Sequence, residues 1–175
     1  MTAGVVLCGG QSSRMGQNKS ELIYKGKPLK AFMRSVLLDA GLDSVYFSGP
    51  DGIADEQSGL GPLSGMSSSL RALDDGINVL FVPVDMPLLN SKLVAGLLDV
   101  VEDSEVTRFE GQHFPLILKN TKKVRQILTK QLEDKQLAIH QLFEQLSQKL
   151  VELEGQSVQF TNVNTQKEWQ AIKNN

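Results

Sequence analysis

The chain has 175 residues, 41% of them hydrophobic and 22% charged, which excludes a disordered tail, a collagen-like rod and a disulfide scaffold. It has one cysteine, no apolar run near the roughly 20 residues of a membrane span and no basic signal segment, so we expect a soluble cytoplasmic protein. The net charge is −2, but residues 1–34 alone sum to +5 (six basic, one acidic), which suits a small anionic ligand and is too short a segment to indicate nucleic acid binding.

Apolar runs bounded by glycine alternate with amphipathic segments in the first half of the chain. Short apolar runs of this kind are typical of buried parallel strands, and apolar residues at spacings of three and four predict helices. In chain order, the pattern predicts a strand at 3–8, a helix over 29–40, a strand at 44–48, a helix from Pro62 to 74–76 and a strand at 77–84.

The second half continues the alternation less clearly. It predicts a helix over 93–101, one or two strands within 104–118, one or two helices within 121–150, a short strand at 158–160 and a capping box at 165–168 that opens a terminal helix. Strands alternating with helices predict an α/β fold with a mostly parallel sheet. With no repeat and no linker, we expect a single domain over residues 1–175.

Three loops fall at the expected carboxyl ends of strands, where open α/β sheets bind ligands. The first, 9–19, combines glycines with Arg14 and Lys19. Glycines let backbone N–H groups approach phosphate oxygens, and the two cations offset their charge, although the spacing matches neither a Walker loop nor G-x-G-x-x-G. The alternative is an ordinary glycine-rich turn with two solvated cations.

Asp85 follows the most apolar predicted strand, so its backbone is rigidly placed at the same edge of the sheet. A carboxylate there can hold Mg²⁺ against substrate phosphates. The alternative is a turn-forming aspartate that bonds to its own loop.

Several other residues admit both a functional and a structural interpretation. The glycines around Pro62 offer N–H groups near a helix start, Asp55 can accept hydrogen bonds from a base, and alternating amides near the carboxyl terminus can hold polar ligand atoms. His113 and His140 lack metal-ligand spacing, Trp169 is expected to pack, and Cys8 lacks a nearby base and is expected to be a small buried side chain.

Four motifs follow one another along the chain: GQSSRMGQNK at residues 10–19, GPLSG at 61–65, PVDMP at 83–87 and NVNT at 162–165. The first fits the pattern G-x-S-x-R-M-G-x-x-K. Taken together and in this order, the four motifs closely resemble those of the sugar-phosphate-type nucleotidyltransferases, and within them the molybdenum cofactor guanylyltransferases.

The resemblance implies a Rossmann-like three-layer nucleotidyltransferase fold with a mostly parallel mixed sheet. It implies transfer of GMP from GTP to Mo-molybdopterin with Mg²⁺, and molybdoenzyme maturation proteins as partners. By motif, Arg14, Lys19 and Asp85 would be catalytic and Asp85 would bind the metal. The nucleotide and its neighbourhood would be contacted by Leu7, Cys8, Gly9, Gly10, Lys19, Ser48, Asp55, Asp85, Asn162 and Asn164, with Ser48 where the family often has asparagine.

The resemblance leaves two alternatives open. One is a cytidylyltransferase or another nucleotidyltransferase acting on a related phosphorylated acceptor. The L-x-G-G start at residues 7–10 and the Met at position 86 favour GTP over CTP by resemblance. The other is a non-catalytic nucleotide-binding protein of the same fold, against which the retention of Arg14, Lys19 and Asp85 together argues.

Overall fold

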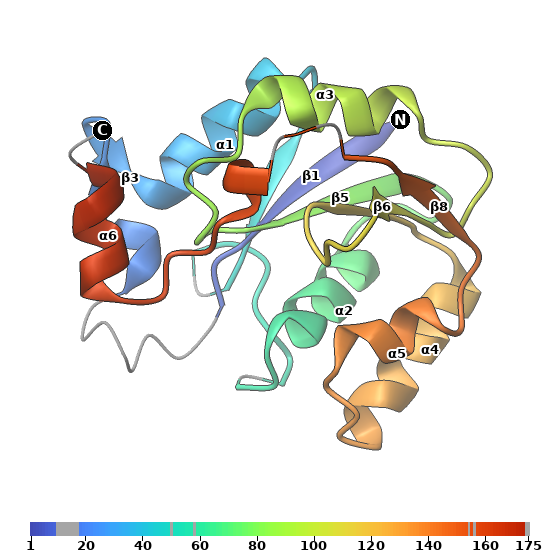
Figure 1. Ribbon diagram of the computed structural model, residues 1–175. Helices are drawn as coiled ribbons and strands as arrows, with labels where there is room; N and C mark the ends of the chain where they lie inside the picture. Colours follow the sequence, from blue (N-terminus) through green and yellow to red (C-terminus); the bar gives the residue numbers. More distant parts are fainter. Residues whose placement is uncertain (10–17, 50, 58, 154, 156, 174–175) are drawn as a thin grey trace.

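The computed structural model describes residues 1–9, 18–49, 51–57, 59–153, 155 and 157–173 (Figure 1). Six strands form one sheet in the order β4-β1-β5-β7-β6-β8, with helices on both faces. The strands are β1 (Thr2–Leu7), β4 (Val45–Ser48), β5 (Asn78–Pro83), β6 (Val106–Phe109), β7 (Leu116–Lys119) and β8 (Gln148–Val151). The predicted three-layer α/β architecture is confirmed.

The sheet is mixed but mostly parallel. β1 runs parallel to both of its neighbours, β4 and β5, and β8 runs parallel to β6. β7 lies between β5 and β6 and is antiparallel to both. The parallel half therefore places the carboxyl ends of β4, β1 and β5 at one edge of the sheet, as the sequence predicted for a ligand site.

The helices divide between the two faces of the sheet. α1 and α3 cover one face, α2, α4 and α5 cover the other, and α6 lies beside β3 at one end of the molecule (Figure 1). The bounds are α1 Leu29–Asp39, α2 Pro62–Ala72, α3 Ser91–Asp99, α4 Lys122–Glu133, α5 Ile139–Phe143 and α6 Gln166–Lys173.

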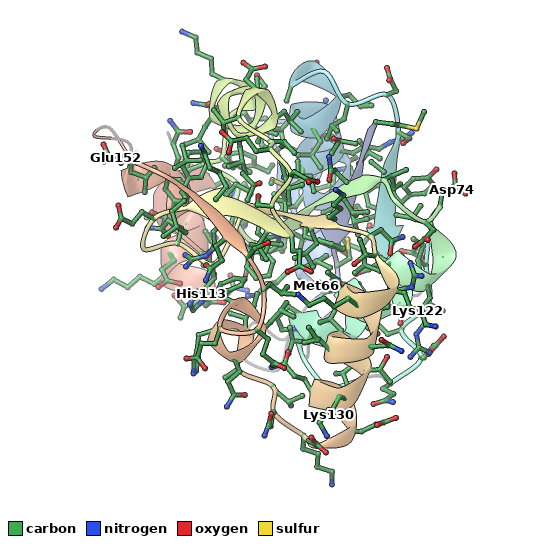
Figure 2. All side chains as sticks on the ribbon, turned by 90° about the vertical axis from the view of Figure 1, so that its right-hand side faces the viewer. Met66, Asp74, His113, Lys122, Lys130 and Glu152 are labelled. Atoms are coloured by element: carbon green, nitrogen blue, oxygen red, sulfur yellow. The ribbon has the colours of Figure 1, made fainter. Side chains whose placement is uncertain are left out.

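Alternate side chains of the central strands enter two separate apolar clusters. Val6 and Leu80 pack with α1 and α3, whereas Val5 and Phe81 pack with α2 and α4. The continuous apolar runs in β1 and β5 arise because both faces of these strands are buried. Figure 2 shows Met66 of α2 in this packed interior, where it has no exposed surface. Each such side chain contributes roughly 1.5–3 kcal/mol relative to exposure.

Local signals set the helix boundaries close to the predicted ones. Gly61 has φ +71° and precedes Pro62 at the first position of α2. Asn90 and Thr121 cap α3 and α4 by accepting hydrogen bonds from the backbone N–H groups of Leu93 (2.9 Å) and Val124 (3.3 Å). The predicted capping box is confirmed as well, since Glu168 accepts from the N–H of Thr165.

Two local predictions differ from the structure, and one short hairpin was not predicted. Residues 158–160 do not form a strand but part of the 3₁₀ helix η2 (Ser157–Phe160), because Thr161 closes the turn by donating twice to the carbonyl of Val158. β8 lies inside the region predicted to be helical. The short hairpin of β2 (Ile23–Tyr24) and β3 (Lys27–Pro28), which follows the 3₁₀ helix η1 (Lys19–Glu21), was not predicted.

β8 could not be predicted from local pattern because its side chains are exposed or half-buried on both faces. It forms through pairing with β6, some forty residues earlier, in the register Val106 to Gln148 through Phe109 to Val151. Such non-local pairing overrides local composition. In the described part of the chain, no helix has the length and apolar character needed to cross a membrane.

Candidate functional site

The ends of three parallel strands bring the predicted site residues together. Leu7, the last residue of β1, pairs with Ser48 on one side and with Pro83 on the other. The backbone N–H of Val84 donates to the carbonyl of Leu7 (3.0 Å), so the pairing continues past β5. Asp85 is therefore fixed one residue beyond the sheet edge, as the sequence predicted.

Asp85 forms an ion pair with Lys19 at the centre of this edge. Lys19 Nζ lies 3.1 Å from Asp85 Oδ2 and donates a second hydrogen bond to Asn164 Oδ1 (2.7 Å). The backbone N–H of Val163 donates to the carbonyl of Asp85 (2.8 Å), which holds the amide-bearing segment against the strand end. Three residues from three predicted motifs thus lie in direct contact.

The second carboxylate oxygen of Asp85 is available to a ligand. Oδ1 is buried and has no hydrogen-bond partner among the described residues. A buried carboxylate oxygen without a partner is costly, and a divalent cation or a ligand donor would satisfy it. Within the described ranges no three acidic, histidine or cysteine side chains cluster as metal ligands. One carboxylate together with substrate phosphates and waters is nevertheless a common arrangement for Mg²⁺, so the donor set fits.

A second pair of buried polar atoms lies on the far side of Gly9. Ser48 Oγ and Asp55 Oδ1 are buried and lack a partner within the part of the chain that the structure describes. A Cβ atom on Gly65 would lie 2.9 Å from Ser48 Oγ, and one on Gly9 would lie 2.8 Å from Asp55 Oδ2. A side chain at either glycine would therefore press against these oxygens, and burial raises the pKa of the Asp55 carboxyl.

A cavity of about 270 Å³ opens at this edge of the sheet. Its walls combine strand ends, the Lys19–Asp85 pair and residues from two other loops. The lining residues are Leu7, Cys8, Gly9, Lys19, Pro62, Pro83, Val84, Asp85, Phe114 and Asn162. Six of the residues predicted from sequence line this cavity. Three more contact its lining residues: Asn164 accepts a hydrogen bond from Lys19, Ser48 pairs with Leu7, and Asp55 lies beside Gly9.

Phe114 is a lining residue that sequence interpretation missed. It falls within residues 104–118, which were predicted to form one or two strands, but β7 begins only at Leu116. Leu116 pairs with Phe81 in the antiparallel register of β5 and β7, which brings the preceding residues beside the end of β5. No local pattern in the sequence indicates this neighbour, because it depends on which strand β7 joins.

The thiol of Cys8 has no catalytic activation. It is half-buried, lies 3.6 Å from the carbonyl oxygen of Val6 and donates to it. Burial is the largest cause that raises the pKa of this thiol to about 12, so it is protonated near neutral pH. Cys8 therefore contributes a cavity wall and not a nucleophile, in agreement with the sequence interpretation.

The remaining predicted residues fall into three groups. Gly10 and Arg14 lie outside the described residues, so their predicted roles stay predictions. Trp169 is buried and packs against Tyr24, with ring centroids 5.9 Å apart, as expected for a structural residue. Neither His113 nor His140 is part of the cavity lining described above.

The fold and this edge define a class of protein. Parallel strand ends, a cavity lined by Gly9, a cation paired with a carboxylate and a buried carboxylate oxygen without a described partner are features suited to a phosphorylated ligand in an α/β fold. A model of the MobA-like NTP transferase domain matches residues 4–150. The chain belongs to this family of nucleotidyltransferases, as the resemblance of its motifs indicated.

Individual relatives agree with the family assignment. A molybdenum cofactor guanylyltransferase of Xanthomonas euvesicatoria is 43% identical over 130 residues, which are 72% of this chain and 68% of that protein. A probable molybdenum cofactor guanylyltransferase of Bacillus licheniformis is 26% identical over 97% of this chain and 95% of its own length. Molybdopterin-guanine dinucleotide biosynthesis protein A of Archaeoglobus fulgidus superposes with a TM-score of 0.77 at 16% identity, covering 99% of this chain and 97% of the other, which confirms the fold.

Proposed function

We propose that this protein transfers GMP from GTP to the phosphate of Mo-molybdopterin and releases pyrophosphate. The observation that supports this most directly is the Lys19–Asp85 pair at the carboxyl ends of β1 and β5, where Asp85 lines the cavity and its Oδ1 is buried without a partner among the described residues. The 43% identity to a protein named molybdenum cofactor guanylyltransferase supports the choice of donor and acceptor.

The proposed reaction needs charged groups that bring the phosphates together, and it needs no general base. The attacking phosphate monoester has a second pKa near 6, so it is largely dianionic at neutral pH and needs no deprotonation. The obstacle is the approach of two polyanions and the charge that develops on the leaving pyrophosphate. Lys19, which reaches Asp85 and Asn164, supplies a positioned cation for these phosphates.

Asp85 is the residue that would hold Mg²⁺, because its Oδ1 has no other partner among the described residues. When bound, the metal neutralises phosphate charge and orients the leaving group. Asp85 itself contributes an oxygen ligand fixed by the strand end, so little reorganisation is needed when substrate arrives.

Base selection is assigned to Asp55 and Ser48. Guanine presents two adjacent N–H donors on its Watson–Crick edge, and a carboxylate can accept from both. Asp55 Oδ1 and Ser48 Oγ are buried acceptors without partners among the described residues, and both lie close to Gly65, where a Cβ atom would be 3.3 Å from the first and 2.9 Å from the second. Cytosine and adenine present a different pattern of donors, which would leave one of these buried oxygens unsatisfied.

The test is a direct assay of product formation. Purified protein is incubated with GTP, Mg²⁺ and molybdopterin, and pyrophosphate and the dinucleotide product are measured. We expect both to form in equal amounts, and only with all three components present. Faster transfer from CTP would identify a cytidylyltransferase, and nucleotide binding without pyrophosphate release would identify a non-catalytic binding protein.

A further inference from the structure

A second hollow of about 460 Å³ adjoins the cavity at the strand ends. The two share three lining residues, Pro62, Phe114 and Asn162. Met86, the residue after Asp85, also lines the second hollow. The second hollow therefore lies next to the cavity that holds the Lys19–Asp85 pair. Phe114 stands between the two.

The walls of this hollow combine a flexible apolar surface with a few polar groups. Met86, Leu137, Ile139 and Phe160 provide the apolar part. Gln112, His113 and Asn162 provide hydrogen-bonding groups. A flat heteroaromatic ring with polar edges suits such a surface, because its faces can pack against apolar side chains while its edges meet amide and imidazole groups.

Arg108 holds the loop that forms the polar wall. Its guanidinium donates to the carbonyls of Gln112 (2.9 Å) and Phe109 (3.4 Å) and donates twice to Gln148 Oε1 (3.1 and 2.9 Å). It also lies 4.4 Å from the ring centroid of Phe143, at a distance that gives a favourable cation–π contact. The loop between β6 and β7 is thereby tied to β8 and α5.

His113 lies near the same Phe143 ring that Arg108 contacts. The rings of His113 and Phe143 lie 6.0 Å apart, and Gln148 donates from Nε2 to the carbonyl of Phe143 (2.9 Å). Desolvation and the neighbouring charge of Arg108 lower the pKa of His113, so its imidazole is neutral near neutral pH and offers one donor and one acceptor. Figure 2 shows His113 on the side of the molecule opposite to Asp74.

We infer that the second hollow receives the heteroaromatic ring of the phosphorylated acceptor, with His113 and Gln112 as ring-binding residues and Arg108 as the residue that positions them. This inference rests on the proposed function, since it assumes that the acceptor phosphate reaches Lys19 and Asp85. The shared wall at Phe114 and Asn162 then separates the two substrates while their phosphates meet beside Asp85.

His113→Ala and His140→Ala form a matched pair that tests the hollow. Both remove an imidazole, but His140 is exposed on α5 and does not line the hollow. We expect His113→Ala to raise the KM for molybdopterin about tenfold with a much smaller change in kcat, because it removes ring contacts and leaves the phosphate site intact. His140→Ala should match the wild type, and an unchanged acceptor KM in His113→Ala would overturn the inference.

Arg108→Gln tests the positioning role. The variant loses the hydrogen bonds that Arg108 donates to the carbonyls of Gln112 and Phe109, together with the cation–π contact, so the loop is no longer held in place. We expect a higher acceptor KM than in the wild type and an unchanged affinity for GTP measured by calorimetry. Equal losses for GTP and acceptor would indicate general unfolding of this end of the sheet and would contradict a role confined to the acceptor.

A binding measurement separates failure of this inference from failure of the proposed function. The probe is an oxidised fluorescent pterin with a phosphate monoester on its side chain, titrated into wild-type protein, His113→Ala and His140→Ala without turnover. Weaker binding in His113→Ala alone supports the hollow even if no GMP transfer is found. GMP transfer by the wild type with equal probe binding in all three proteins would leave the proposed function standing and overturn the hollow.

Discussion

Lys19 and Asp85 are 66 positions apart in the sequence, yet their side chains form a 3.1 Å ion pair in which each is less than one-fifth exposed. Lys19 belongs to η1 after the glycine-rich loop, and Asp85 follows β5. The ion pair therefore connects η1, which follows β1 in the chain, to the end of β5, which lies parallel to β1. A phosphate group entering the cavity meets both a cation and a carboxylate, which is the basis of the first two predictions.

Asp85→Asn should lower turnover by at least about 10², as for a lost electrostatic stabiliser. Asparagine keeps the volume of the side chain, so the packing of β5 and the thermal midpoint should change little. It replaces one carboxylate oxygen with an NH₂ group that cannot ligate a cation. Pyrophosphate release and thermal shift with GTP, with and without Mg²⁺, measure the effect. Normal Mg²⁺-dependent turnover in this variant would place the metal elsewhere.

Lys19→Ala should reduce turnover by about 10²–10³ while the fold stays intact. Lys19 is partly exposed in η1, so its truncation opens no core cavity. Lys92→Ala, an exposed lysine on α3, is the matched control and should have wild-type activity. The measurement is kcat for pyrophosphate release, with circular dichroism to confirm folding. Equal kcat in the two variants would show that Lys19 only stabilises its loop.

GTP should raise the thermal midpoint more than CTP, ATP or UTP, and Mg²⁺ should increase the shift. A ligand that binds only the native state stabilises it by RT ln(1 + [L]/Kd), about 2.7 kcal/mol at one hundred times Kd. The buried acceptors on Asp55 and Ser48 match the two N–H donors of guanine. Differential scanning fluorimetry at equal nucleotide concentrations tests this, and a larger shift with CTP would contradict guanylyl specificity.

Asp55→Asn should weaken GTP binding and at the same time stabilise the free protein at neutral pH. Burial raises the pKa of this carboxyl in the folded state, so its charge opposes folding above that pKa. Removing the charge therefore stabilises the fold at pH 7, and the gain should disappear at low pH, where the carboxyl is protonated in both states. GTP affinity should fall about 10- to 100-fold, as expected for lost hydrogen bonds to a charged group.

Two measurements test whether Asp55→Asn raises the stability of the free protein while it weakens GTP binding. Thermal midpoints of wild type and Asp55→Asn across pH 4–8 should converge as the pH falls, and calorimetry at pH 7 gives the GTP affinity. A variant with lower stability at neutral pH would show that the Asp55 carboxylate forms a stabilising contact, and unchanged GTP affinity would remove Asp55 from the nucleotide site.

Gly52→Ala and Gly96→Ala should change stability in opposite directions. A Cβ on Gly52 would lie 2.2 Å from the carbonyl oxygen of Phe47, which accepts from the N–H of Ile53 (2.8 Å). The backbone leading to Asp55 would have to move, at a cost of about 1–3 kcal/mol. Gly96 lies in α3 with nothing within 4 Å of its Cβ position, so alanine should stabilise by about 0.8–1 kcal/mol. Urea unfolding measures both, and equal effects would refute the close approach at Gly52.

Some residues of the site could be predicted from the sequence, and others could be found only in the structure. Lys19, Asp85 and Asn164 each belong to a local motif, so they could be singled out without knowing that they touch. Ser48 was assigned to the nucleotide only through resemblance, whereas Asp55 was also singled out as a candidate acceptor for a base. That both carry buried oxygens without partners among the described residues became visible only in the structure. Phe114 and the hollow beside it had no local signal, because β7 reaches the end of β5 through a pairing between distant segments.

The sequence by itself determined the alternating α/β order, the capping box at Thr165 and Glu168, and the buried strands β1 and β5, since each depends on neighbours a few residues away. Tertiary structure alone decided that Gln148–Val151 is a strand, since the strand forms by pairing in register with β6. It also decided that Arg108 anchors the loop beside the second hollow. Contacts between residues forty or more positions apart depend on how whole helices and strands pack together. The residues next to each partner in the sequence do not reveal that packing.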